Sequence, residues 1–315
     1  MYYIIINPAS RSGKGLRLWA DIEPILKNRE IPYKAFLSKE AGHVSKIVKD
    51  ISDSVLSQNT EQILKLIVLG GDGTINEALQ GITDFERTQI GYIPTGSSND
   101  LARDLKLGSD PGTVLDRILS CSEPFLMDVG QLTYKDSEGK DQVRYYAGSC
   151  GIGYDAAVCE ETLTSKLKVF FNKIGLGKLT YLAIALKQLL STKKVSCTFT
   201  LDNNEVITLP KFFFVAFMQH QYEGGGFMFC PGADSQDGIL DICAVGNVSK
   251  LKVLIALPTA FKGKHYFFKG VDSYRTSSIH LEASTPLWVH TDGEVVAKTD
   301  TLTATCLKQK LQLLF

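Results

Sequence analysis

Short apolar runs alternate with helical patterns from the start of the chain to about residue 125. The apolar runs, which have the length of strands, cover residues 2–6, 33–37, 64–69 and 90–93. The helical patterns between and after them cover residues 16–27, 43–52, 75–82 and 114–119. Strands that alternate with helices in this way predict a parallel sheet with flanking helices. We therefore expect an α/β domain over residues 1–125.

The pattern changes after about residue 126 to strand-like segments separated by turn signals. These segments cover residues 127–134, 143–147, 195–201, 212–218 and 279–283, with a polar turn at 135–140. One helical stretch, residues 166–190, interrupts them. Such spacing predicts an antiparallel, sandwich-like, β-rich second domain over residues 126–305.

The composition changes this picture little but excludes several classes of protein. The chain has 315 residues, of which 44% are hydrophobic, and this length suits two domains. Lys plus Arg and Asp plus Glu number 34 each, so we expect no nucleic-acid partner. The start, MYYIIINPAS, lacks the features of a signal peptide, and no stretch approaches about 18 uninterrupted apolar residues. We expect a soluble cytoplasmic protein.

Cysteines and histidines give no sign of a metal or disulfide framework. The seven cysteines include no Cys-x-x-Cys pair, and the five histidines are scattered. We expect reduced cysteines that pack in the core, and no zinc site. A core or surface role is expected for each histidine, and His290 is singled out only because it lies close to Asp292.

The stretch VLGGDGTINEA, residues 68–78, places one acidic residue among three glycines, between an apolar run and a helical pattern. Glycines let a ligand touch the backbone, and the amides of a helix N-terminus favour an anion such as phosphate. The spacing matches neither GxxxxGK[ST] nor GxGxxG. Asp72 would repel a bare phosphate, so a metal ion, a ribose hydroxyl or a water is its expected partner. The alternative is a tight turn with Asp72 as a helix cap.

Two further loops follow predicted strands. NPASRSGKG, residues 7–15, comes after the first strand, and PTGSSND, residues 94–100, comes after the strand that ends at Ile93. Ligands of open α/β folds bind at the carboxyl ends of the strands. Each loop alone is a common turn, but the three together predict one nucleotide-binding crevice.

The order of these motifs resembles the diacylglycerol kinase catalytic-domain family, in particular its soluble bacterial lipid kinases, which are similar to sphingosine and ceramide kinases. The GGDGT core alone is shared with kinases of NAD and of fructose 6-phosphate. Two later segments extend the resemblance over nearly the whole chain: PGADSQDGIL at residues 231–240 and TDGE at residues 291–294. One departure is Ser97-Ser98, where many relatives have threonine after the glycine; the hydroxyl is kept.

The resemblance implies an ATP-dependent lipid kinase that uses Mg²⁺, with diacylglycerol as the leading acceptor. It implies a first domain similar to those of phosphofructokinase and NAD kinase, a β-rich second domain, and a return of residues 306–315 to the first. The residues implied at the nucleotide are Asn7, Pro8, Ser10, Gly13, Lys14, Ser38, Gly70, Gly71, Asp72, Gly73, Thr74, Asn76, Gly96, Ser97, Asn99, Asp100 and Glu294.

The resemblance also implies the catalytic and metal residues. Asp292 is the implied general base, with Asp72 as the next candidate, and Glu294 contacts the nucleotide or its magnesium. Asp234, Asp237 and Ile239 form an implied magnesium site away from the transferred phosphate, to which a solvated turn is the alternative.

The local geometry of the TDGE segment is open. Asp292 and Glu294 are two residues apart, so they would point to the same side of an extended chain. The residues alone favour a hairpin turn at Asp292-Gly293, between residues 288–290 and 295–297.

Two segments mix lysines with aromatic and aliphatic residues, at 166–190 and 261–269. Lysines beside apolar residues suit a surface that touches a membrane, and equally a core covered by solvated lysines. From the resemblance we expect a lipid substrate at the inner face of the cell membrane, reached by a peripheral protein, and a homodimer. The alternatives are a kinase of another lipid alcohol, an NAD kinase, and a nucleotide-binding regulator without turnover.

Overall fold

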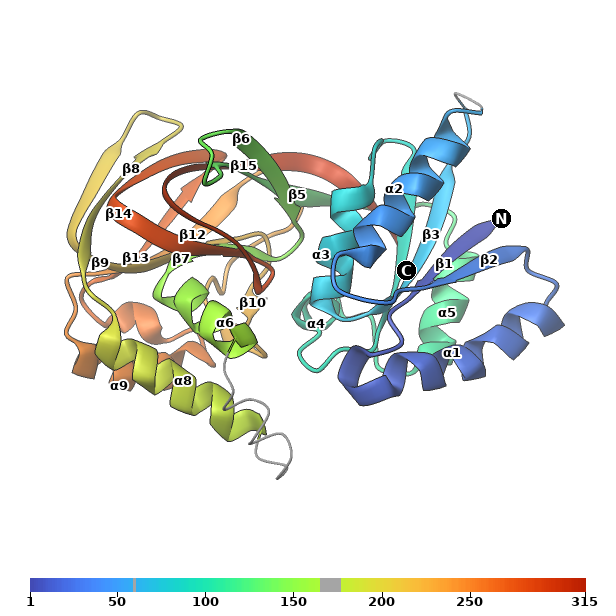
Figure 1. The fold of residues 1–315 in the computed structure, drawn as a ribbon, viewed down its shortest axis with the longest axis horizontal. Coiled ribbons are helices and arrows are strands. Elements are labelled where there is room, and N and C mark those ends of the chain that lie inside the picture. The colour runs from blue at the N-terminus through green and yellow to red at the C-terminus, as the bar shows by residue number, and fades with distance from the viewer. Residues whose placement is uncertain (59–60, 165–176) are drawn as a thin grey trace.

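The computed structural model describes residues 1–58, 61–164 and 177–315, which form two domains (Figure 1). The strands of the first domain are β1 (Tyr2–Ile6), β2 (Tyr33–Leu37), β3 (Leu64–Gly70) and β4 (Thr88–Pro94). Its helices are α1 (Ser10–Asn28), α2 (His43–Leu56), α3 (Asp72–Gly81), α4 (Asp100–Asp104) and α5 (Pro111–Ser120). The four strands pair in parallel in the order β4-β3-β1-β2, which is the arrangement predicted from the alternating pattern.

Both faces of this sheet are covered by helices, because successive residues of a strand point to opposite sides. Tyr3 and Ile5 of β1 pack in a core that includes residues of α2 and α3. Ile4 and Ile6 pack on the other face, in a core that includes residues of α1 and α5. The near-continuous apolar character of these strands therefore reflects burial on both faces.

The second domain is β-rich, as predicted, and its paired strands are antiparallel. The strands are β5 (Phe125–Lys135), β6 (Asp141–Tyr146), β7 (Ser149–Gly153), β8 (Val195–Leu201), β9 (Val206–Met218), β10 (Tyr222–Glu223), β11 (Phe227–Met228), β12 (Leu240–Gly246), β13 (Val271–Thr276), β14 (Ser278–Thr291) and β15 (Glu294–Leu314). The long strands β9 and β14 each pair with both β7 and β8, so the pairing closes on itself around a shared core.

Helices lie at one end of the second domain: α6 (Tyr154–Thr164), α8 (Gly177–Ser191), α9 (Lys250–Ala260) and the short 3₁₀ helix η1 (His265–Phe267) (Figure 1). No helix in the described ranges has the length and apolar character needed to cross a bilayer. All seven cysteines are free, and five of them are buried, in accord with the packing role expected from the sequence.

The last strand, β15, connects the two domains. It pairs with β14 and β5 in antiparallel fashion and then with β4 in parallel, through Gln312, Leu313 and Leu314. The end of the chain therefore lies in the first domain's sheet, where the resemblance placed residues 306–315. Because one strand belongs to both domains, its first residue, Glu294, is held in a fixed place at the domain junction.

Several elements differ from the sequence-based expectations. Helix α1 begins at Ser10 rather than near residue 16, but Arg11, Ser12 and Gly13 within it have positive φ angles and form a turn. Helices α6 and α9 were not predicted. Apolar residues occupy most of α9, so it shows no one-sided pattern. Of the helix predicted at 166–190, residues 166–176 lie outside the described residues, and α8 covers the rest.

Candidate active site

A polar crevice lies at the carboxyl ends of the parallel strands, where the sequence predicts a nucleotide. Its volume is about 410 Å³. The predicted residues that line it are Asn7, Pro8, Ser10, Ser38, Gly71, Gly73, Thr74, Gly96 and Glu294. The loops after β1, β3 and β4 thus form one crevice, as their position after neighbouring parallel strands implies.

Side chains tie the three loops together. The Asn7 amide donates to Thr74 Oγ1 at 3.0 Å, which joins the loop after β1 to the start of α3. The hydroxyls of Ser10 and Thr95 lie 2.7 Å apart, which joins the loops after β1 and β4. These bonds fix the crevice before any ligand arrives, so a ligand would lose little of its binding energy to ordering the loops.

Eight predicted nucleotide residues do not line this crevice in the described part of the chain: Gly13, Lys14, Gly70, Asp72, Asn76, Ser97, Asn99 and Asp100. Gly13 has a φ of 87° and shapes the turn that enters α1. Asn99 supports the loop after β4, because its amide donates to the Gly96 carbonyl at 3.0 Å. Asp72, Asn76 and Asp100 belong to a second site, described below.

Glu294 enters the crevice from the second domain and lies against the first turn of α3. A Cβ atom added to Gly73 would lie 2.5 Å from Glu294 Oε1. Only glycine permits this approach without displacing the carboxylate. The GGDGT segment is thus built to accept an acidic side chain from another domain as well as a ligand.

A second cavity of about 230 Å³ lies at the domain junction. The first domain contributes Asp72, Ile75, Ser98, Asp100 and Leu101 to its lining, and the second contributes Ala147, Gly148, Ser149, Cys159, Thr162, Leu163, Tyr222, Glu223, Gly224, Asp292 and Gly293. The lining is mostly apolar, but its polar positions are dominated by carboxylates. The cavity therefore combines room for an apolar group with acidic side chains from both domains.

The two cavities are separated by two short segments whose residues alternate between them. Gly71 and Gly73 line the crevice, and Asp72 between them lines the second cavity. Likewise Asp292 and Gly293 line the second cavity, and Glu294 lines the crevice. A group bound in one cavity is therefore close to a group bound in the other.

Asp292 lies in a tight turn, so the extended geometry considered for Asp292 and Glu294 is wrong and the hairpin alternative is correct. Thr291 pairs with Glu294 across this turn, and the φ angles of Asp292 and Gly293 are 49° and 82°. Positive φ at both central residues is typical of a type I′ hairpin, which favours Asp-Gly. The turn directs the carboxylates of Asp292 and Glu294 into different cavities.

The Asp292 carboxylate is fully hydrogen-bonded. It accepts from Asn76 Nδ2 at 2.8 Å and from the backbone N–H groups of Ala147 at 3.0 Å, Gly148 at 2.7 Å and Ser149 at 2.9 Å. A carboxylate has about four lone-pair sites, so these four donors occupy its capacity. In this conformation Asp292 has little room to accept a proton from a substrate.

Arg144 supports this arrangement and was missed in the sequence. Its guanidinium donates to Asn76 Oδ1 at 2.8 Å and to Thr291 Oγ1 at 2.9 Å. Asn76 is completely buried, so its amide orientation is fixed by Arg144 on one side and Asp292 on the other. Arg144 lies in β6, whose sequence DQVRYY carries no motif, and only the fold brings it to α3.

Asp72 has a different environment. It is the first residue of α3, and it accepts hydrogen bonds from the N–H groups of Asp100 and Leu101, at 3.2 and 3.4 Å. It therefore caps α4 rather than its own helix. Burial, with the nearby charges of Asp100 and Asp292, raises the pKa of Asp72 to about 6. Burial also raises the pKa of Asp100, against the effects of the Gly225 N–H and Arg103.

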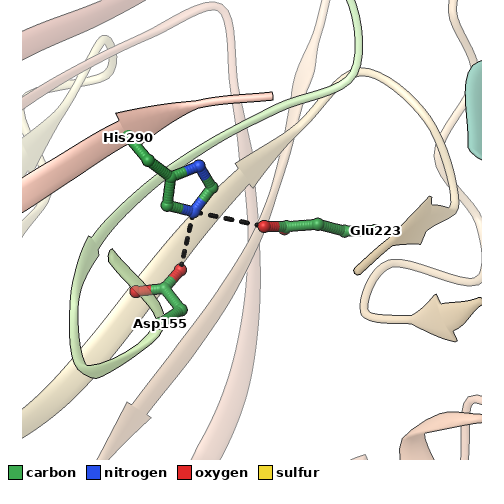
Figure 2. A group of neighbouring side chains, drawn as sticks. All are labelled: Asp155, Glu223 and His290. Atoms are coloured by element: carbon green, nitrogen blue, oxygen red, sulfur yellow. Dashed lines mark hydrogen bonds and ion pairs between the residues drawn. The ribbon is translucent and has the colours of Figure 1, made fainter. Parts of the chain in front are cut away.

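Asp155, Glu223 and His290 form a cluster in which His290 is buried and the two carboxylates are largely covered (Figure 2). His290 Nε2 is 3.3 Å from Asp155 Oδ2 and 3.1 Å from Glu223 Oε1. Glu223 also lines the cavity. Sequence reasoning singled out only His290, because the three residues are far apart in the chain and share no motif.

The implied magnesium residues Asp234, Asp237 and Ile239 lie in the loop before β12. Asp237 accepts from the Ile239 N–H at 2.9 Å, and its other oxygen pairs with the Arg275 guanidinium. Asp241 bonds the same guanidinium at 3.2 Å, and its buried Oδ2 accepts no hydrogen bond from the described residues. Two carboxylates, Asp237 and Asp241, thus face one guanidinium, which leaves a surplus of negative charge that suits a hard cation.

Two family models match the chain in sequence. The diacylglycerol kinase catalytic domain matches residues 1–132, and the YegS C-terminal NAD kinase beta sandwich-like domain matches residues 148–315. Among named relatives, "Putative lipid kinase YtlR" of Bacillus subtilis (strain 168) is 26% identical over 95% of this chain and 94% of its own. A protein named diacylglycerol kinase from Staphylococcus aureus (strain JH9) is 28% identical over 94% of this chain and 86% of its own.

Solved structures share the fold over almost the whole chain. A structure titled as a diacylglycerol kinase from Bacillus anthracis str. Sterne has a TM-score of 0.68 and 20% identity, and covers 100% of this chain and 96% of that one. Yeast NADH kinase complexed with NADH has a TM-score of 0.54 and 9% identity, and covers 99% of this chain and 82% of that one. These likenesses place both domains in a known arrangement.

Proposed function

Since the chain belongs to the diacylglycerol kinase catalytic-domain family, whose relatives are named as lipid kinases, we propose that it transfers the γ-phosphoryl group of ATP to the hydroxyl of a lipid alcohol, with diacylglycerol as the leading acceptor. One observation carries the proposal. The polar crevice and the mostly apolar cavity adjoin, separated only by the segments that hold Asp72 and Asp292. Phosphoryl transfer requires such a meeting of an anion site and an acceptor site.

The crevice supports the nucleotide half of the proposal. The N-terminus of α3 opens into it through Gly71 and Gly73, and a helix N-terminus favours phosphate. Glu294 stands at the same place and would hold magnesium bound with the phosphates. Bound magnesium would neutralise the charge of the phosphate groups.

Asp72 is the proton acceptor that the geometry favours. A general base works best when its pKa is near the operating pH, and the pKa of Asp72 is raised to about 6. It accepts only two, rather long hydrogen bonds, whereas Asp292 accepts four. We therefore assign proton removal to Asp72 and assign to Asp292 the task of holding the domain junction, which reverses the order implied by the resemblance.

The magnesium site at Asp234, Asp237 and the backbone of Ile239 is kept as part of the proposal. Its test is the thermal shift produced by magnesium. Because a metal bound only to the folded state stabilises it by mass action, Asp237→Ala should abolish the shift. Arg275→Ala, which removes the guanidinium but keeps the carboxylates, should preserve it. An equal shift in Asp237→Ala and in the unsubstituted protein would show that magnesium binds elsewhere.

A membrane-facing surface is also part of the proposal. Leu251, Leu254 and Ile255 of α9 are exposed, and Phe267 next to it is 85% exposed. Lysines are interspersed with them in the sequence, and the exposed ones are Lys252, Lys262, Lys264 and Lys269. Exposed apolar residues interspersed with exposed lysines suit the surface of an anionic bilayer. The segment 166–173, proposed from the sequence for the same task, lies outside the described residues.

The direct test is transfer of labelled phosphate from ATP to a panel of acceptors: diacylglycerol, monoacylglycerol, a long-chain amino alcohol, NAD and water. We expect a labelled lipid, with diacylglycerol giving the highest kcat/KM. Label on another lipid alcohol would keep the lipid kinase proposal and change the acceptor. Label on NAD, or on water alone, with an Asp72→Asn protein as the inactive control, would overturn it.

A further inference from the structure

Hydrogen bonds and ion pairs connect the segments that line the cavity at the domain junction into a closed circuit. From α3, Asp72 accepts from the N–H groups at the start of α4, and Asp100 of α4 accepts from the Gly225 N–H at 2.7 Å. The loop with Gly225 also carries Glu223, whose Oε1 is 3.1 Å from His290 Nε2. From His290 the circuit of interactions continues through the Asp292-Gly293 turn back to α3.

The return depends on the second nitrogen of the histidine ring. His290 Nδ1 accepts a hydrogen bond from the Gly293 N–H at 3.2 Å, within the turn that carries Asp292. Asp292 in turn accepts from Asn76 of α3 at 2.8 Å. His290 is completely buried, and both its ring nitrogens have partners. His290 therefore links the Glu223–Gly225 loop, which is bonded to α4, with the Asp292-Gly293 turn, which is bonded to α3.

The position of the ring is built into the neighbouring backbone. A Cβ atom at Gly151 would lie 2.0 Å from Asp155 Oδ2 and 2.4 Å from His290 Nε2, so this strand position must be glycine for the pair to form. Asp155 and Glu223 both face Nε2 (Figure 2). Two acceptors at Nε2 and one donor at Nδ1 favour the tautomer with its proton on Nε2.

The same geometry argues against two other roles. A histidine that binds a metal through Nε2 carries a proton on Nδ1 and donates it, but here Nδ1 faces an N–H donor. Burial lowers the pKa of His290, whereas Cys159, Glu223 and Asp155 raise it, and the net direction is upward. A second proton would nevertheless meet the Gly293 hydrogen at Nδ1. Burial also raises the pKa of Glu223, which offers that proton an alternative place.

We propose that His290 is a positioning residue for phosphoryl transfer: held by Asp155 and Glu223, it fixes the Asp292-Gly293 turn at the acceptor cavity through its Nδ1 atom. The proposal rests on the proposed function, since the cavity is the acceptor site. It adds a role for three residues that the nucleotide and base assignments leave unused.

Two substitutions separate the two halves of the imidazole. Asn places an acceptor where Nδ1 lies, so His290→Asn should keep the bond to Gly293 and retain kcat within about threefold. Gln replaces only Nε2, so His290→Gln should lose that bond and lower kcat about tenfold or more. The larger loss is expected because a misplacement of about 1 Å can cost about 100-fold. KM for ATP should change less than kcat in both, since Glu294 is the only residue of the turn that lines the crevice. His265→Gln, at another buried histidine, is the matched control.

Equal kcat values in the Asn and Gln variants, with comparable melting temperatures, would overturn the proposal. A measurement that does not depend on activity, the NMR signals of the histidine rings, distinguishes failure of this proposal from failure of the proposed function. In the protein with ¹⁵N-labelled histidine, the ring signals lost in His290→Asn should show one protonated and one unprotonated nitrogen at neutral pH. Two protonated nitrogens, or signals that change when a chelator is added, would contradict the assignment. Absence of lipid phosphorylation with the expected ring signals would sink only the proposed function.

Discussion

The crevice and the junction cavity are built in opposite ways. The crevice is made mainly by loops that directly follow neighbouring parallel strands, so its residues are grouped in short motifs. The cavity is made by α3, α4, the segment before β7, α6, the β10 loop and the hairpin turn, which are distant in the chain. The difference indicates that a phosphate site can be encoded locally, whereas an acceptor site depends on how two domains meet.

The largest expected effect is at Asp72, which stands where the two cavities adjoin. Asp72→Asn keeps the shape of the side chain and removes its proton affinity, so turnover should fall at least about 100-fold, since a general base contributes about 10²–10⁴-fold. Nucleotide binding should be retained, because Asp72 lines the other cavity. Turnover near that of the unsubstituted protein would remove Asp72 from the chemistry.

The same substitution should raise stability. The pKa of Asp72 is about 6 in the folded chain and 3.8 as the ordinary value, so the folded state binds more protons between these pH values and stability falls as pH rises through them. Above about pH 6 the ionised carboxylate destabilises the fold, and Asp72→Asn should raise the free energy of unfolding by about 1–2 kcal/mol after some loss of hydrogen bonding to α4. Denaturant unfolding at pH 5 and pH 8 would measure this; a larger gain at pH 5 would contradict it.

Asp292→Asn should lower stability, unlike Asp72→Asn, and should lower turnover less. Its amide nitrogen would face N–H donors, so the free energy of unfolding should fall by about 1–3 kcal/mol, the cost of leaving buried donors unpaired. Turnover should fall about tenfold through displacement of the turn, less than in Asp72→Asn. If Asp292→Asn instead loses more activity than Asp72→Asn at unchanged stability, Asp292 is the base, as the resemblance implied.

The sequence predicted the crevice far better than the cavity. The Gly70 to Thr74 motif indicated where a phosphate would bind, because a strand, a glycine turn and a helix start are local features. Arg144, Asp155 and Glu223 carry no such signal, because each becomes relevant only when a segment from another part of the chain packs against it.

The secondary structure likewise divides into elements that a local pattern predicted and elements that it did not. Parallel strands buried on both faces were recognised from continuous apolar runs, but α6 and α9 have weak helical patterns and were missed. The hairpin at Asp292-Gly293 is a local prediction that held, whereas the direction of the two carboxylates into separate cavities required the fold.

Gly73→Ala should sharpen the comparison from the crevice side. The added methyl group would displace Glu294, so ATP should bind about tenfold more weakly, equivalent to about 1.4 kcal/mol, while melting temperature changes little. Titration calorimetry with a nonhydrolysable ATP analogue would measure it. Gly232→Ala, where a Cβ would meet open space, is the matched control. Equal nucleotide affinity in the two variants would show that Glu294 does not need its place against α3.

The smallest effect of a single substitution concerns the membrane, which neither cavity explains by itself. An apolar acceptor must leave a bilayer to enter the cavity, so the exposed apolar residues beside α9 should affect delivery rather than chemistry.

Phe267→Ser should weaken binding to anionic vesicles about fivefold, since apolar burial in the interface contributes roughly 25 cal/mol per Å², and should leave activity on detergent-dispersed lipid unchanged. Val206→Ser removes another exposed apolar residue, near the β8–β9 hairpin at the opposite end of the domain, and should have no effect (Figure 1). Neutralising Lys166, Lys168 and Lys173 together, chosen from the sequence alone, should weaken vesicle binding by up to about 1 kcal/mol per charge, less as salt rises. Equal vesicle binding by the Phe267 and Val206 variants would assign the α9 surface to ordinary solvent exposure and leave delivery to another face.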